Sequence, residues 1–308
     1  MPEGHKHSTA HSENRTWRSV QSLLGESADA DIALLGVPLG RHSISPGRCD
    51  LAPDAVRKVL SRLSTYDLET KKDLSGTEIF DAGNLQTAEL DYADACQPIS
   101  RAVRDLAAKH ELVILLGGDN AITRPGVRGA DASLQQVGLL TLDAHFDLRD
   151  TDGGLNNGNP VQALLEDGLP GAHISQVGLA PYANTRRAHL KAEAAGISVR
   201  TLSECWTRGF STIVREELAR LSSHCSRIYT DFDIDVIDRA QMPSAPGSRP
   251  GGIPARDFFE AARIVAASPH VACVDLVEFD PSKDLNDIGA LTAGRWLAEI
   301  LAGFEARG

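Results

Sequence analysis

Short continuous apolar runs recur along the chain and alternate with stretches of helical periodicity, and this alternation limits the possible folds more than any other feature. Continuous apolar runs are typical of parallel strands that are covered on both faces. Strands that alternate with helices predict βαβ units around a parallel sheet. The predicted strands are Ile32–Val37, Leu112–Leu116, Val137–Leu142, Ile174–Leu179, Ile228–Phe232 and Val271–Val277, with a weaker one near Glu78–Asp81.

The stretches between these runs have the residue patterns of helices. The predicted helices are Ala52–Leu63, Asp94–Lys109, Val161–Glu166, Thr185–Ala195, Thr212–Leu221, Ala255–Ala267 and Leu291–Phe304. No internal repeat, long linker or break in composition interrupts the series, so residues 17–308 are predicted to form a single domain. Residues 1–16 are polar and rich in histidine, and they are predicted to form a flexible tail.

Charge and cysteine content exclude several classes of protein. The 308 residues include 42 Asp and Glu against 31 Lys and Arg, a net charge of −11. This balance argues against a nucleic-acid binder and against docking on an anionic membrane. No apolar run approaches the ~20 residues of a membrane span, and the N-terminal segment lacks a signal-peptide pattern, so a cytoplasmic protein is expected. The five cysteines form no CxxC pair, which argues against a disulfide framework or a thiolate zinc site.

Acidic motifs follow four of the predicted strands directly. They are Gly117–Asn120, Asp143–Asp147, Asp233–Asp238 and Glu278–Pro281. In an open parallel sheet, these segments fall at the carboxyl edge of the strands, where ligands bind. The motifs are therefore predicted to meet at one site. For Asp119 taken alone, a turn or helix N-cap is an equally good interpretation.

Two of these motifs have the spacing of a metal site. Asp143, His145 and Asp147 occupy every second position, and so do Asp233 and Asp235, which places each set on one face if the strand geometry continues. Converging carboxylates repel one another unless a cation lies between them. Oxygen donors with an imidazole suit Mn²⁺ best, while Fe²⁺, Co²⁺, Ni²⁺ and Zn²⁺ stay open as alternatives.

The order of the motifs resembles the ureohydrolases, which are the arginases, agmatinases and formimidoylglutamases. The resemblance includes Ser45–Arg57 and the helix that begins at Leu291, and it covers about residues 30–305. It implies a three-layer α/β/α fold with a parallel sheet of about eight strands. It also implies a homo-oligomer, a trimer or a hexamer, that hydrolyses a C–N bond of a small amidine or guanidino compound with two Mn²⁺ ions per chain.

The resemblance also implies roles for individual residues. The metal ligands that it implies are Asn120, Asp143, His145, Asp147, Asp233 and Asp235. Asp143 and Asp233 would bridge both ions, and the other four would complete the two sites. Glu278 would bind the cationic nitrogen of the substrate, because an amidinium needs a fixed anionic partner. Asp147 would also pass a proton to the leaving amine.

Two residues depart from the family pattern. Asn120 stands where the family has a histidine ligand, and its neutral carbonyl oxygen is expected to weaken the first metal site. Asn157 stands where arginases and agmatinases have a histidine that shuttles protons. Because an amide does not titrate, that role is missing or is served by another group, and Asn157 is placed among the substrate-binding residues.

The branch of the family is predicted from two further segments. Asp147-Leu148-Arg149 resembles formimidoylglutamases, so the favoured reaction is N-formimino-L-glutamate to L-glutamate and formamide, with Arg149 on a substrate carboxylate. A salt bridge from Arg149 to Asp150 or Asp152 is the alternative. The loop that contains Arg249 resembles agmatinases instead, and Arg249 would contact the substrate or be a surface charge. An agmatinase, another urea-releasing guanidino hydrolase, and a metal-poor non-catalytic member therefore stay open.

Overall fold

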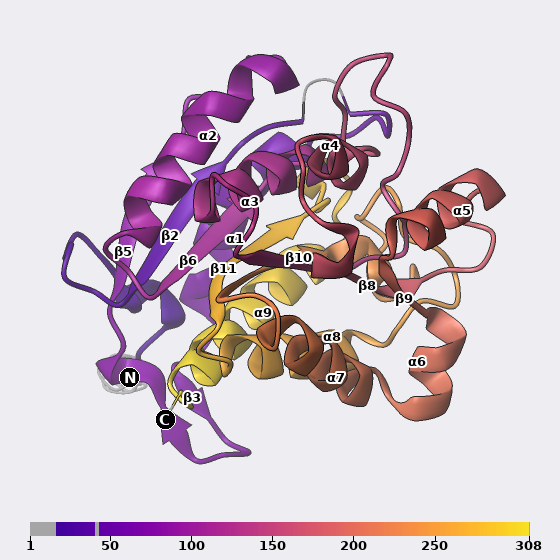
Figure 1. Ribbon diagram of the computed structural model, residues 1–308. Coiled ribbons are helices and arrows are strands. Elements are labelled where there is room, and N and C mark those ends of the chain that lie inside the picture. Colours follow the sequence, from indigo (N-terminus) through magenta and orange to yellow (C-terminus); the bar gives the residue numbers. More distant parts are fainter. Residues whose placement is uncertain (1–16, 41–42, 308) are drawn as a thin grey trace, which may run out of the picture.

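The structure is a computed structural model that describes residues 17–40 and 43–307 (Figure 1). The predicted tail at residues 1–16 lies outside the described residues. Nine strands of the described chain form one parallel sheet in the order β1-β5-β2-β6-β11-β10-β7-β8-β9. Their bounds are Leu24–Gly25, Ile32–Val37, Ile79–Asn84, Leu112–Gly117, Val137–Leu142, Ile174–Leu179, Ser198–Thr201, Arg227–Asp233 and Val271–Val277 for β1, β2, β5, β6, β7, β8, β9, β10 and β11.

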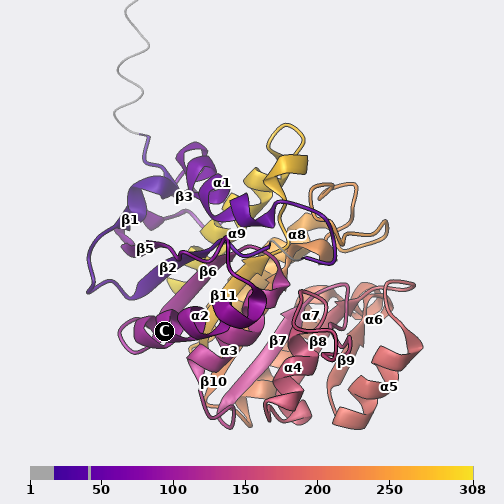
Figure 2. The ribbon, with the colours of Figure 1, turned by 90° about the horizontal axis from the view of Figure 1, so that it is seen from above.

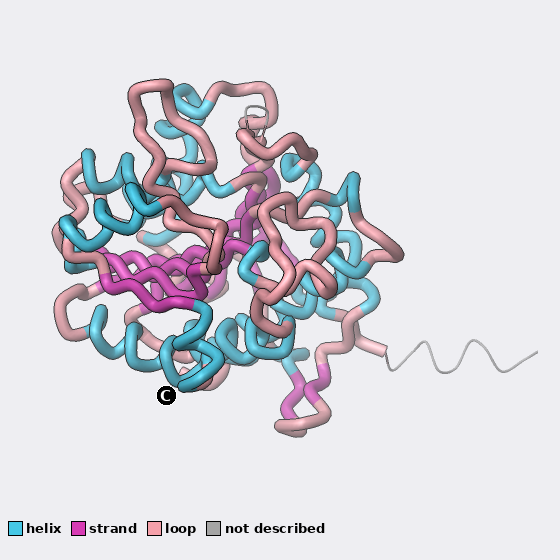
Figure 3. The backbone as a smooth tube through the Cα atoms, turned by 90° about the vertical axis from the view of Figure 1, so that its right-hand side faces the viewer, coloured by secondary structure: helices cyan, strands magenta, loops and turns pink. Residues whose placement is uncertain are grey.

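Helices cover both faces of this sheet (Figure 3). Their bounds are Ala52–Val59, Tyr92–Ala107, Thr123–Ala130, Pro160–Glu166, Arg186–Ala195, Leu202–Arg208, Phe210–Ser222, Ala255–Ala266 and Ile288–Phe304 for α1 to α9. One apolar core joins the sheet to α1, α7, α8 and α9, and a second joins its other face to α2, α3 and α4. The predicted three-layer α/β/α fold is confirmed, with one strand more than the expected eight or so.

The predicted strands are confirmed. They could be predicted because strands that are buried on both faces have continuous apolar runs. Every residue of β2, β6, β7 and β8 is buried. The unpredicted strands β1 and β9 lie at the two opposite ends of the sheet (Figure 2). There a strand has a neighbour on one side only, and its residues are only partly buried or exposed. A short antiparallel hairpin, β3 (Tyr66–Asp67) with β4 (Lys72–Asp73), stands apart from the main sheet (Figure 3).

Strand order is what brings the acidic motifs together. The strands that precede them are β6, β11, β10 and β7, which are consecutive neighbours in the middle of the sheet. All are parallel, so the four motifs emerge at one edge, side by side. Among the described residues, no helix combines the length and apolar character needed to cross a bilayer.

A buried ion-pair network holds α7 against the sheet. The Glu217 carboxylate is 1% exposed and accepts hydrogen bonds from Arg200 Nε at 2.6 Å, Ser175 Oγ at 2.7 Å and Arg220 Nε at 2.9 Å. Burial disfavours its charge, but the bonds from Ser175, Arg220 and Arg200 outweigh burial and lower the pKa of Glu217 to about 2. The folded state therefore favours the ionised form.

Glu217→Gln is expected to lower the free energy of unfolding by about 2 kcal/mol at neutral pH, because the partly exposed guanidinium groups of Arg200 and Arg220 lose their anion and their hydrogen bonds to a charged group. A lowered pKa contributes stability above the pKa of the unfolded chain, and that contribution is lost as pH falls toward about 2. The difference between the native protein and the variant should therefore shrink on acidification. Urea unfolding at several pH values measures it. The exposed Glu216→Gln is the control, and it should cost under about 1 kcal/mol.

Candidate metal centre

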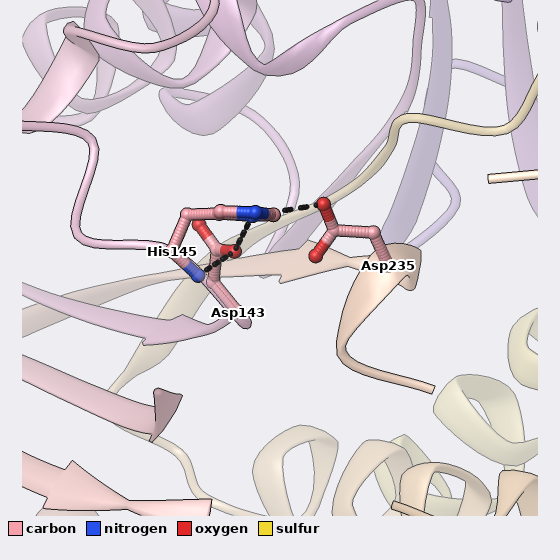
Figure 4. A group of neighbouring side chains, drawn as sticks. All are labelled: Asp143, His145 and Asp235. Atoms are coloured by element: carbon pink, nitrogen blue, oxygen red, sulfur yellow. Dashed lines mark hydrogen bonds and ion pairs between the residues drawn. The ribbon is translucent and has the colours of Figure 1, made fainter. Parts of the chain in front are cut away.

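Asp143, His145 and Asp235 form a compact group of ligand atoms at the sheet edge. Asp143 and His145 follow β7, and Asp235 lies in a 3-10 turn after β10. Nδ1 of His145 lies 3.0 Å from Oδ2 of Asp235 and 3.4 Å from Oδ1 of Asp143 (Figure 4). One ligand atom of each residue lies within 4.8 Å of the others. The group therefore has the donor types and the spacing that a single cation requires.

The other three predicted ligands meet beside this group. Nδ2 of Asn120 donates to Oδ2 of Asp147 at 2.5 Å and lies 3.5 Å from Oδ2 of Asp233. The Asp235 backbone N–H donates to Oδ1 of Asp233 at 2.9 Å, which joins the two halves. All six predicted ligands thus gather at one place. The amide nitrogen of Asn120 faces the carboxylates, as expected for a hydrogen-bond donor next to anions.

Burial makes the charges of this cluster costly. Burial and the neighbouring Asp235 raise the pKa of Asp143 to about 6, and the pKa values of Asp147 and Asp233 are raised well above their usual range for similar reasons. Burial opposes the charge of His145, but Asp235 and Asp143 outweigh it and raise the pKa of the imidazole to about 12. Asp147 and Asp233 therefore favour the protonated form, whereas, despite burial, His145 lowers the pKa of Asp235, and a cation among these groups would favour the ionised carboxylates.

The backbone around the cluster is strained at two of its acidic residues. Asp147 and Glu278 have φ values of 52° and 64°, in the left-handed region that disfavours residues with a Cβ. Such strain persists where surrounding contacts fix the chain, and it collects at functional sites. The loop after β10 lies very close to the cluster, since a Cβ on Gly247 would lie 1.8 Å from Oδ2 of Asp235. Glycine lets this loop close over the cluster.

Glu278 is held by two amide groups. Its Oε1 accepts from the Asn120 backbone N–H and from Nδ2 of Asn157, both at 2.9 Å. Oδ1 of Asn157 accepts from the Ile44 backbone N–H at 2.9 Å, so Asn157 links Glu278 to the segment before α1. Asn157 lines the cavity, and its amide positions Glu278, while its predicted role in binding substrate stays a prediction. Burial raises the pKa of Glu278 to about 7, although both amide bonds lower it.

A cavity of about 580 Å³ opens above the cluster and carries charges of both signs. Its buried acidic residues, here called the acidic floor, are Asp233, Asp235 and Glu278. Its exposed basic residues, here called the arginine rim, are Arg149, Arg187 and Arg249. A molecule with a cationic end and an anionic end would find a partner for each.

The rim includes both predicted arginines and one that sequence reasoning missed. In the described part of the chain, Arg149 forms no ion pair with Asp150 or Asp152. Asp150 pairs instead with Arg187 and Lys191, each at 2.8 Å. Nη1 of Arg249 donates to the Gly247 carbonyl of its own loop at 2.6 Å. Arg187 lies in the first turn of α5, and no motif marks it. Only the placement of α5 beside the motif after β7 brings it to the cavity.

The fold is that of a ureohydrolase, a hydrolase that acts on linear amidines. The chain belongs to the arginase family, whose family model matches residues 30–303. The resemblance predicted from the motifs is thereby confirmed, and the formimidoylglutamase branch is well represented among the similar proteins.

Three comparisons illustrate this. The formimidoylglutamase of Halalkalibacterium halodurans is 32% identical over 88% of this chain and 86% of its own length. The crystal structure of formimidoylglutamase from Bacillus subtilis superposes with a TM-score of 0.90 at 25% identity, covering 98% of this chain and 96% of that one. Trypanosoma cruzi formiminoglutamase, solved with manganese, shares the fold with a TM-score of 0.86 at 22% identity, over 95% of this chain and all of that one.

Proposed function

We propose that the chain hydrolyses N-formimino-L-glutamate to L-glutamate and formamide, with two Mn²⁺ ions per chain. The observation that carries this proposal is the acidic floor and the arginine rim in one cavity. The substrate has a cationic amidine at one end and two carboxylates, so both kinds of lining residue would have an opposite charge to pair with. The relatives named formimidoylglutamase support the same substrate.

The donor set of the cluster fits manganese, because carboxylate oxygens predominate over a single imidazole. Six side chains would hold the two ions: Asn120, Asp143, His145, Asp147, Asp233 and Asp235. When bound, the ions supply Lewis acidity and lower the pKa of water at the site. The first ion, on the Asn120 side, is expected to bind more weakly, because a neutral amide oxygen replaces an imidazole there.

Residues of the chain would bind and orient the substrate and supply the proton. Glu278 would hold the amidinium, and Asn157 keeps that carboxylate in place through its bond to Oε1. Water adds to the formimino carbon, and the bond from this carbon to the glutamate nitrogen breaks. The leaving amine must gain a proton, which Asp147 would deliver from the side of the cluster. The arginine rim would bind the carboxylates and so fix the carbon over the floor.

Guanidino acids are the second candidate substrates, because they also combine a cationic end with a carboxylate. A guanidino acid hydrolase of Homo sapiens is 27% identical over 88% of this chain and 77% of its own length. Agmatine fits less well, because it has no carboxylate and its second positive charge would face the rim. The charge pattern of the cavity therefore ranks the candidate substrates.

A substrate screen of the manganese-loaded protein tests the proposal. We expect N-formimino-L-glutamate to be hydrolysed with the highest kcat/KM, 4-guanidinobutyrate and arginine more slowly, and agmatine and guanidine least. Faster turnover of agmatine than of N-formimino-L-glutamate would refute the substrate assignment. No turnover of any of the five would favour the metal-poor, non-catalytic alternative.

Two neighbouring substitutions on α5 test the role of the arginine rim. Arg187→Gln is expected to raise KM for N-formimino-L-glutamate about tenfold and to leave guanidine hydrolysis unchanged, because guanidine has no carboxylate to bind. Its neighbour Arg186 is exposed and does not line the cavity, so Arg186→Gln should leave KM unchanged. Equal effects of the two variants would show a general change of surface charge.

A single domain over residues 17–308, a cytoplasmic location and assembly into a trimer or hexamer stay predictions. Sedimentation of the purified protein tests the assembly.

A further inference from the structure

The side chain of Asn120 lies between the cluster and a buried hydroxyl. On one side, its Nδ2 faces Asp147 and Asp233. On the other side, its Oδ1 lies 2.7 Å from Oγ1 of Thr123, which begins α3. Oγ1 of Thr123 also lies 2.9 Å from Oδ2 of Asp275 in β11. Asn120, Thr123 and Asp275 are at most 1% exposed, so hydrogen bonds within this chain matter to each of them.

With the Asn120 amide in this orientation, Thr123 has one hydroxyl hydrogen for two neighbouring acceptors. A hydroxyl has one hydrogen to donate, yet both of its neighbours, Oδ1 of Asn120 and Oδ2 of Asp275, are acceptors. Asp275 already accepts from the Tyr229 hydroxyl at 2.7 Å and from the Phe232 backbone N–H at 3.2 Å, and both bonds favour its ionised form. Thr123 can satisfy only one of its two acceptors.

A half turn of the Asn120 amide, which exchanges the places of Oδ1 and Nδ2, would remove this mismatch at Thr123. Nδ2 would then donate one hydrogen to Oγ1 of Thr123, and the Thr123 hydroxyl would donate its single hydrogen to Asp275. The same half turn points Oδ1 of Asn120 at Asp147 and Asp233. That orientation is unfavourable beside bare carboxylates and favourable when a cation lies among them.

We propose that Thr123, held by Asp275, is a positioning residue that turns Asn120 into a metal ligand. The Asn120 amide has two orientations. Without a cation, its N–H₂ group bonds to the carboxylates, and with a cation, its Oδ1 faces the ion while N–H₂ bonds to Thr123. This rests on the manganese centre of the proposed function. It explains how an asparagine can serve in a position where its amide otherwise faces the wrong way.

Manganese affinity measured without substrate tests the proposal. Titration of Mn²⁺ followed by electron paramagnetic resonance counts free ions, so it reports the weaker site directly. Thr123→Val is expected to weaken that site about tenfold or more, as is typical when a partner of a metal ligand is lost, and Thr123→Ser should restore it. Thr230→Val is the control, because Thr230 is equally buried and its hydroxyl has no partner among the described residues.

A double-mutant cycle separates positioning from a general loss of structure. If Thr123 acts through Asn120, Thr123→Val should have no further effect on manganese affinity in an Asn120→Ala background. Native affinity in Thr123→Val, or an equal loss in both backgrounds, would overturn the proposal. Tight manganese binding without hydrolysis of N-formimino-L-glutamate would refute the proposed function and leave the role of Thr123 standing. A native protein that binds no manganese would overturn both.

Discussion

Asp235→Asn is expected to lower the manganese content by about one ion per chain and kcat/KM by at least about 10³-fold. Asp235 contacts His145 at 3.0 Å and belongs to the compact group of ligand atoms. The substitution removes one negative charge and replaces a carboxylate oxygen with a neutral amide, which is a weaker ligand. The stabilisation that a metal ion gives to developing charge is worth several kcal/mol, so its loss removes about three powers of ten in rate.

Two measurements check this result independently of each other. Metal analysis after gel filtration gives the ion content, and thermal unfolding with and without Mn²⁺ gives binding by mass action, because a ligand of the folded state raises Tm. The Tm increase should be smaller for the variant than for the native protein.

Asp238→Asn is the matched control for the loss of one charge from the same motif. The Asp238 carboxylate accepts from the backbone N–H groups of Ala240 and Gly251 and so acts as a turn former outside the cluster. Its variant should keep the native manganese content. A native manganese content in Asp235→Asn would contradict the ligand assignment.

The sheet was predictable from the sequence wherever burial dictated the residues. β2, β6, β7, β8, β10 and β11 carry apolar runs because helices cover both of their faces. β9 was missed because an edge strand with the sequence Ser-Val-Arg-Thr has no such run. α3 was missed because Pro125, Gly126 and Gly129 lower its helix propensity. Packing explains Gly126, since a Cβ there would lie 2.2 Å from the Tyr229 hydroxyl.

The sequence predicted which residues gather at the site, but it did not predict how their side chains are oriented or which other residues reach the cavity. The position of each motif after a strand predicted that the six candidate ligands meet at one edge, and the structure places those six residues together. Long-range packing decided the rest. Asn120 contacts Thr123, and Thr123 contacts Asp275, which lies 152 residues from Thr123 in sequence. Arg187 reaches the cavity only because of where α5 lies, and residue spacing carries no signal of that.

Glu278→Gln is expected to lower kcat/KM for N-formimino-L-glutamate by about 10²- to 10³-fold while leaving manganese content unchanged. Glutamine keeps an oxygen that can accept from Asn120 and Asn157, so the geometry of the site is preserved and only the charge is lost. Burial raises the pKa of Glu278 to about 7, and a bound cation would favour its ionised form at neutral pH. Removing one partner of a buried charge pair typically costs about 2–5 kcal/mol, which gives the expected factor.

Glutarate separates the two ends of the cavity in this variant. It has the two carboxylates of the substrate and no amidine, so it should depend on the arginine rim and be independent of the Glu278 charge. Its inhibition constant should therefore be unchanged or lower in Glu278→Gln, and higher in Arg187→Gln. A parallel loss of glutarate binding in Glu278→Gln would mean that the substitution disturbs the whole cavity. A native kcat/KM in Glu278→Gln would instead require another anion for the amidinium, and Asp147, which also lines the cavity, would be the next to test.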